Sequence, residues 1–211
     1  MLTLYGHPLS SPSNKVRMTA HAVGEEYDFI LIDLSKGEQK SEKYLAVNPV
    51  GQVPAIEDGD LMLFESNAIC KYLARKNRSA LAPEEPATQA RVDQWTDLVS
   101  NLLNTGYTRL LYNKVVAPQI GVEADDNAIR EGEEMLARAL PIIEAQLGRG
   151  GFLAGGELSL ADIALLATMD PTEILEVDLS TYPKLAAWRE DLRGRDFYTR
   201  VHAHYGEGFF D

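Results

Sequence analysis

The sequence predicts an α+β protein of two domains, in which an N-terminal α/β domain precedes an all-α helical-bundle domain. Strand-like and helix-like patterns alternate over residues 1–77, whereas residues 89–211 show helical periodicity and almost no strand signal. Between them, residues 78–88 are rich in turn formers and include two prolines. We therefore expect domains at 1–77 and 89–211, joined by a linker over 78–88.

Each element of the first domain follows from a local pattern. Runs rich in β-branched and aromatic residues predict strands, Gly24 predicts a helix stop, and Gly59 predicts the turn of a hairpin. The expected elements, in chain order, are a strand over 1–6, a helix over 13–24, a strand over 27–34, a short helix over 41–48, strands over 52–58 and 61–65, and a helix over 66–76.

The second domain is predicted as helices alone. The expected helices cover 87–116, 127–148 with a kink at Pro141, 159–169, 182–194 and 196–206. Ser159 and Asp162 stand three residues apart at the start of the third of these helices, which is the spacing of a capping box. We expect this pair to serve folding rather than catalysis.

Composition excludes several functional classes. The 211 residues carry a net charge of −12, which disfavours nucleic acids and anionic membranes as general partners. No apolar run reaches the roughly 20 residues of a membrane helix, and no signal peptide is expected. The single cysteine, Cys70, excludes an internal disulfide and a multi-thiolate metal site, so we expect a cytoplasmic protein without metal.

A cluster of hydroxyl groups stands at the start of the first predicted helix. The stretch "HPLSSPSNKVR" (7–17) places Ser10, Ser11 and Ser13 around Pro12, where a thiol-exchanging redox protein would carry cysteines. A hydroxyl at a helix N-terminus can donate a hydrogen bond to an anionic sulfur that belongs to a ligand. Dithiol exchange by the protein itself is disfavoured, because no cysteine occupies this position.

Three stretches together resemble the cytosolic glutathione S-transferases, and the resemblance covers the whole chain. They are "YGHPLSSPSNKV" (5–16), "NPVGQVPAIEDGDLMLFESNAICKYLA" (48–74) and "GELSLADIAL" (156–165). The chain is similar to the phi and theta classes, which are serine-type, and it looks like a bacterial member. The resemblance implies a thioredoxin-like first domain, a homodimer, and conjugation of glutathione, as co-substrate, to small hydrophobic electrophiles.

Aligned with this family, Ser10 takes the position of the catalytic serine that stabilises the glutathione thiolate. Ser11 is the second candidate for this role, and Ser13 is expected to cap the helix. Tyr5 is the rival candidate, because other classes use a tyrosine at the end of the first strand.

The resemblance also implies a set of glutathione-binding residues. A cis bond before Pro54 would expose the backbone of Val53 to an extended peptide, although Pro54 could also merely begin an edge strand. Glu65 and Ser66 open a helix, where an anion and free N–H groups suit an amino-acid head group, and Ser66 can cap that helix. The full implied set is Gln39, Lys40, Gln52, Val53, Pro54, Glu65 and Ser66, with Gln39 replacing the usual histidine.

Two questions stay open at this level. Tyr107, Leu111 and Tyr112 could line an electrophile pocket or belong to the core, since both produce a stripe at helical spacing. The same scaffold also suits a glutathione-dependent isomerase or lyase, a disulfide reductase that uses bound glutathione, or a non-catalytic glutathione-binding protein.

Overall fold

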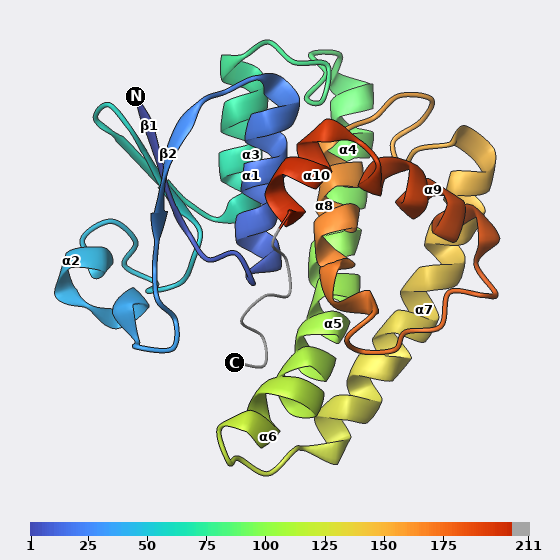
Figure 1. Ribbon diagram of the computed structural model, residues 1–211. Coiled ribbons are helices and arrows are strands. Elements are labelled where there is room, and N and C mark those ends of the chain that lie inside the picture. Colours follow the sequence, from blue (N-terminus) through green and yellow to red (C-terminus); the bar gives the residue numbers. More distant parts are fainter. Residues whose placement is uncertain (204–211) are drawn as a thin grey trace. The chain divides into compact units, whose positions relative to one another are not determined.

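The computed structural model describes residues 1–203 of the chain, and Figure 1 shows its elements. Contacts group Met1–Ala82 with the residues from Arg193 on, and they group Pro83–Leu192 as a second unit. This differs from the predicted division at 77 and 89, because helix α10 (Asp196–His202) packs against helix α1 (Ser11–Val23) of the first unit. The predicted helix over 196–206 ends earlier, and its residues from His204 on lie outside the described part.

A mixed four-stranded sheet forms the centre of the first unit. Its strands are β1 (Leu2–Gly6), β2 (Tyr27–Leu31), β3 (Ala55–Asp58) and β4 (Leu61–Phe64), in the order β2-β1-β3-β4. β1 and β2 run parallel because α1 carries the chain across between them. β3 is antiparallel to both β1 and β4, and the predicted turn at Gly59 joins β3 to β4.

Helices cover both faces of this sheet (Figure 1). α1 and α3 (Ser66–Lys76) lie side by side on one face, and α3 has the predicted bounds. Leu4 and Ile56, paired across β1 and β3, are fully buried with the helix residues Val16 and Ile69. The short helix α2 (Glu42–Leu45) follows a 3₁₀ turn (Glu38–Lys40) and packs on the opposite face. This is the predicted thioredoxin-like arrangement.

The second unit consists of helices, as predicted. Its first helical run extends from Pro86 to Gln119 as α4 (Pro86–Leu98), a π-helical turn (Val99–Leu103), α5 (Asn104–Leu111), a second π-helical turn (Tyr112–Val116) and α6 (Ala117–Gln119). The others are α7 (Asp126–Gly150), which contains Pro141, α8 (Leu160–Thr168), a 3₁₀ turn (Asp170–Thr172) and α9 (Pro183–Arg193). Within residues 1–203, no helix is long and apolar enough to cross a membrane.

The predicted capping box at the start of α8 is present. Oδ2 of Asp162 accepts hydrogen bonds from the backbone N–H of Ser159 (2.9 Å) and from its hydroxyl (2.8 Å). Oδ1 of the same carboxylate accepts from the N–H of Leu153 at 2.9 Å. Every residue of α8 is buried, so this buried carboxylate satisfies backbone donors where water has no access.

Helices α5 and α7 approach each other through two glycines. A Cβ added to Gly106 would lie 2.5 Å from Cδ1 of Leu136 and 3.0 Å from the carbonyl oxygen of Gly132. A Cβ on Gly132 would in turn lie 3.0 Å from the carbonyl oxygen of Gly106. Only residues without side chains let the two backbones come this close.

We predict that Gly106→Ala lowers the free energy of unfolding by about 1 kcal/mol, because overpacking outweighs the gain in helix propensity. Gly148→Ala in α7 is the matched control, since its nearest neighbour outside the helix backbone is Cγ of Lys184 at 3.9 Å. The control should raise stability by up to about 1 kcal/mol. Urea unfolding of both variants checks this, and equal effects of the two substitutions would contradict the close helix contact.

Candidate functional site

Ser10 is the N-cap of α1, at the end of the turn that follows β1. Its backbone is extended, and its Oγ accepts a hydrogen bond from the N–H of Ser13 at 3.3 Å. Its own N–H donates to the carbonyl of His7 (3.0 Å), and its carbonyl accepts from the N–H of Asn14 (2.9 Å). The cap uses one lone pair of the hydroxyl, so the Ser10 O–H remains a donor at the positive end of a 13-residue helix.

The expectation that Ser13 caps this helix is wrong. Ser13 lies inside α1 and is fully buried, and its Oγ accepts from the N–H of His7 at 3.3 Å. The helix starts at Ser11, so Pro12 falls in the first turn, where its missing N–H costs nothing. Ser11, the second candidate, is therefore the first helical residue beside the capping Ser10.

The turn before Ser10 is held by short contacts. The side-chain amide of Asn14 donates to the carbonyl of Pro8 at 2.8 Å, and the N–H of Leu9 donates to Nδ1 of His7 at 3.2 Å. Partial burial lowers the pKa of His7. A Cβ on Gly6 would lie 3.1 Å from both the Phe29 ring and Cβ of Ser13, so a side chain here would crowd the approach of β1 to α1.

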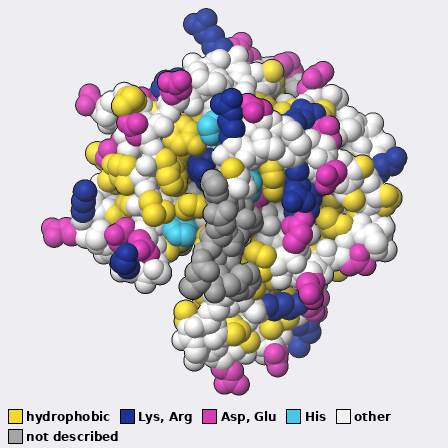
Figure 2. All heavy atoms as spheres, in the orientation of Figure 1, with side chains coloured by type: hydrophobic (Ala, Val, Ile, Leu, Met, Phe, Trp, Pro, Cys, Tyr) yellow, Lys and Arg dark blue, Asp and Glu magenta, His cyan; other side chains and the backbone are white. Residues whose placement is uncertain are grey.

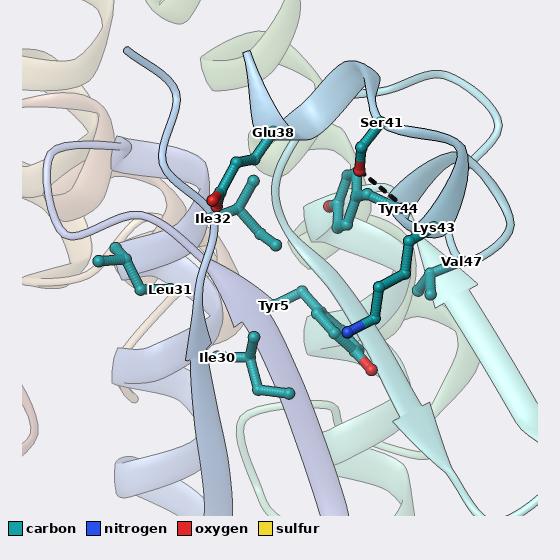
Figure 3. Close-up of a pocket in the computed structure, with 9 residues that line it drawn as sticks. All are labelled: Tyr5, Ile30, Leu31, Ile32, Glu38, Ser41, Lys43, Tyr44 and Val47. Atoms are coloured by element: carbon teal, nitrogen blue, oxygen red, sulfur yellow. Dashed lines mark hydrogen bonds between the residues drawn. The ribbon is translucent and has the colours of Figure 1, made fainter. Parts of the chain in front are cut away.

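The rival candidate, Tyr5, points to the other face of the sheet. Its hydroxyl donates to Oε2 of Glu57 at 2.8 Å, and its ring meets that of Tyr44 edge-on at 6.0 Å (Figure 3). Burial and then the Glu57 carboxylate raise the pKa of Tyr5 to about 12. The Tyr5 hydroxyl therefore already donates its proton to a carboxylate on the α2 side of the sheet, whereas Ser10 lies at the start of α1 on the other side.

The peptide bond between Val53 and Pro54 is cis. Val53 precedes the β ladder, whose first paired residue on β3 is Ala55. The preceding carbonyl, that of Gln52, accepts from the hydroxyl of Tyr44 (2.7 Å) and from the amide of Asn48 (2.6 Å). These two bonds hold the carbonyl that precedes Val53, whose own backbone lies outside the ladder.

Glu65, not Ser66, is the residue that precedes α3. The expectation that Ser66 caps the helix is therefore wrong, since Ser66 is its first residue. Glu65 has φ 69° and ψ 107°, a strained backbone for a residue with a side chain, and its side chain makes no capping hydrogen bond. The first backbone N–H groups of α3 therefore donate to no capping side chain, and the carboxylate of Glu65 is next to them in the chain.

Lys15, which was not among the residues predicted from the sequence, lies between α1 and the start of α3. It is buried on α1, and its Nζ donates to Oδ1 of Asn67 in the first turn of α3 at 2.6 Å. Burial lowers the pKa of Lys15, and the nearby Cys70 and Glu65 oppose that shift. A lysine beside the apolar Val16 on the inner face of α1 was the signal that could have indicated it.

Gln39 and Lys40 lie against the loop that carries Gln52. The Lys40 ammonium donates to the carbonyl of Val50 at 3.2 Å. Gly51 has φ 65°, and a Cβ there would lie 2.8 Å from the Gln39 carbonyl oxygen and from Nζ of Lys40. Oε1 of Gln39 is buried and has no hydrogen-bond partner among the described residues. The structure thus places Gln39, Lys40 and Gln52 in one loop cluster.

The three residues predicted as candidates for an electrophile pocket, Tyr107, Leu111 and Tyr112, differ in their burial within the second unit. Tyr107 is buried, its hydroxyl shares a 2.9 Å hydrogen bond with Thr172, and burial raises its pKa to about 12. Its burial favours the core alternative for this residue. Leu111 is partly exposed and Tyr112 is 46% exposed. Among residues 1–203, no group of three His, Cys, Asp or Glu side chains is arranged to hold a metal.

Comparison with known proteins gives the family. The glutathione S-transferase N-terminal domain family matches residues 1–75, and the glutathione S-transferase C-terminal domain family matches residues 107–196. A probable glutathione S-transferase of Oryza sativa subsp. japonica is 37% identical over 205 residues, which are 95% of this chain and 95% of the rice protein.

Two solved structures have the same fold over nearly the full length. Glutathione transferase F7 from Populus trichocarpa has a TM-score of 0.88 at 32% identity, covering 96% of this chain and 98% of its own. Glutathione S-transferase I from maize, in complex with an atrazine glutathione conjugate, has a TM-score of 0.87 at 34% identity, covering 96% of both chains. All three relatives are plant proteins, so they give no support to the expected bacterial character. The chain belongs to the glutathione S-transferase family.

Proposed function

We propose that this protein conjugates glutathione to small hydrophobic electrophiles, with Ser10 stabilising the thiolate. The observation that carries the assignment is the state of the Ser10 hydroxyl, which accepts the capping bond from Ser13 and keeps its own proton available. Ser11 stands next to it as the alternative donor, and Tyr5 is the weaker candidate because Glu57 already takes its proton.

The thiol of glutathione has an ordinary pKa near 8.5, so only a few per cent is thiolate at pH 7. A hydrogen bond from Ser10 and the positive end of α1 both favour the charged form. Lowering the pKa by about two units requires about 2.7 kcal/mol, which these two effects together can supply. The thiol proton leaves to solvent, and the sulfur then forms a bond to the electrophilic carbon, from which an aryl halide releases its halide ion.

The other residues would hold the peptide around this sulfur. The Glu65 carboxylate suits the ammonium of the γ-glutamyl group, and the first N–H groups of α3, at Ser66 and beyond, suit its carboxylate. Val53, which lies outside the β ladder, can pair with the cysteinyl backbone as a short added strand. Lys40 suits the glycyl carboxylate, with Gln39 and Gln52 beside it.

The finer assignment is a phi-like, serine-type transferase that detoxifies electrophiles as a cytoplasmic homodimer. The plant relatives and the serine at the cap of α1 support the class. Exposed apolar residues on the edge strand β4, among them Met62 and Phe64, offer a surface for a second copy. Leu111 and Tyr112 remain candidates for the electrophile pocket.

We predict that Ser10→Ala reduces kcat/KM by about a hundredfold toward 1-chloro-2,4-dinitrobenzene. The rising limb of the pH–rate profile should also move toward pH 8.5, because the bound thiol loses its donor and its pKa rises. Stopped-flow absorbance across pH 5.5–9 measures both effects. Loss of the cap costs about 1 kcal/mol of stability, so urea unfolding of each variant is recorded alongside.

Two variants control this experiment. Ser10→Thr keeps both the cap and the hydroxyl, and it should retain the low pKa of the thiol. Ser11→Ala removes the neighbouring hydroxyl and should leave the pH profile in place. If Ser11→Ala moves the profile and Ser10→Ala does not, thiol activation belongs to Ser11.

We predict that Glu65→Gln weakens glutathione binding at least tenfold, because it removes the anion that faces the ammonium while keeping the shape of the side chain. Isothermal titration with glutathione measures this, and Glu26→Gln, at an exposed position, is the charge-matched control. Unchanged affinity in Glu65→Gln would remove Glu65 from the binding site.

A further inference from the structure

Lys15 is the one lysine within residues 1–203 that the fold buries. Every other lysine in that range is at least partly exposed, and Figure 2 shows lysine and arginine side chains at the surface of the face that it draws. Lys15 is only 8% exposed, and its ammonium is directed toward α3. Burial removes hydration from a charged group, so an ammonium in this position requires a partner or a function.

Two hydrogen-bonded contacts join α1 to α3, which lie side by side in Figure 1. In the first contact, Nζ of Lys15 donates to Oδ1 of Asn67 at 2.6 Å. In the second, about one turn further along both helices, the hydroxyl of Thr19 lies 3.2 Å from Sγ of Cys70. Because the residue numbers rise in the same direction on both helices, the helices are parallel and their N-termini lie at the same end. The Lys15 contact is the nearer one to that end, since Asn67 is the second residue of α3.

No carboxylate within the described part of the chain forms an ion pair with Lys15. Its ammonium donates to a neutral amide, that of Asn67, and the short distance of 2.6 Å is typical of a charged donor. Glu65 acts on Lys15 only through its field, and its carboxylate is the group proposed to bind the γ-glutamyl ammonium. A cation therefore lies beside the first turn of α3, where a carboxylate of the ligand can balance its charge.

We propose that Lys15 is a positioning residue for the γ-glutamyl carboxylate of glutathione, a role that rests on the proposed function. It holds Asn67, and with it the first turn of α3, and its buried charge adds to the positive end of that helix. Water and salt screen a buried charge less than an exposed one. Glu65 and Lys15 then act on opposite ends of the amino-acid head group: Glu65 contacts the ammonium, and Lys15 favours the carboxylate without touching it.

Two analogues of glutathione separate the two ends of this head group. γ-Aminobutyryl-cysteinylglycine lacks the α-carboxylate and keeps the ammonium, whereas glutaryl-cysteinylglycine keeps the carboxylate and lacks the ammonium. NMR chemical-shift titration of the full-length protein measures the dissociation constants of both analogues and of glutathione, including weak ones. We expect Lys15→Met to weaken the binding of glutathione and of glutaryl-cysteinylglycine about tenfold, and to change that of γ-aminobutyryl-cysteinylglycine by less than about twofold.

Two further variants complete the experiment. Lys43→Met makes the same change at an exposed lysine of α2 and should leave all three dissociation constants unchanged. Asn67→Asp serves if Lys15→Met does not fold, because its carboxylate would lie against the Lys15 ammonium and cancel the charge while keeping the contact. It should cause the same selective loss, confined to the two ligands that carry the α-carboxylate.

A purely structural role of Lys15 predicts a different result. Equal losses for all three ligands in Lys15→Met would mean that Lys15 only supports the fold, and they would overturn the proposal. Unchanged binding of glutathione in this variant would overturn it as well. A failure of the proposed function is distinguishable from both outcomes, because the wild-type protein itself would then not bind glutathione.

Discussion

The hydrogen bond from the N–H of Ser13 to Oγ of Ser10 is the contact on which the proposed chemistry depends. It sets the residue at which α1 begins, and it holds the hydroxyl of Ser10 at the positive end of that helix. Asn14 and His7 hold the turn before it, and Gly6 lets β1 come close enough for the turn to be short. A capping residue is an acceptor toward its helix, so the same side chain can still donate to an anion outside it.

Two other residues near this helix end, Glu65 and Lys15, lower the stability of the folded state locally, and the rest of the fold must offset that free energy. Glu65 is held at a positive φ, which costs about 1–3 kcal/mol. Lys15 is buried, where the charged form loses hydration, and it is compensated by Asn67 and by the field of Glu65. Strain and buried charge of this kind concentrate at functional sites, because selection for stability alone would remove them.

The alternation of side chains along β1 divides the first unit into two chemical environments. Leu4 is buried on the side of α1 and α3, whereas Tyr5, the next residue, faces α2. This alternation separates Tyr5 from the helix end that carries Ser10. It also gives one small sheet two faces, one covered by long helices and one only partly covered by a four-residue helix.

Local patterns in the sequence determined the fold class, the bounds of α3, the hairpin at Gly59 and the capping pair of α8. Each of these features depends on residues a few positions apart in the sequence, so it can be predicted without tertiary contacts. Only the tertiary structure decided between Ser10 and Ser13 as the cap, because both satisfy the local rule and the contact of Ser13 with His7 depends on how β1 meets α1. It also made Tyr107 a core residue through Thr172, 65 positions away, and brought Lys15 to Asn67 across 52. Burial and long-range hydrogen bonds are properties of the packed chain, which periodicity in the sequence does not encode.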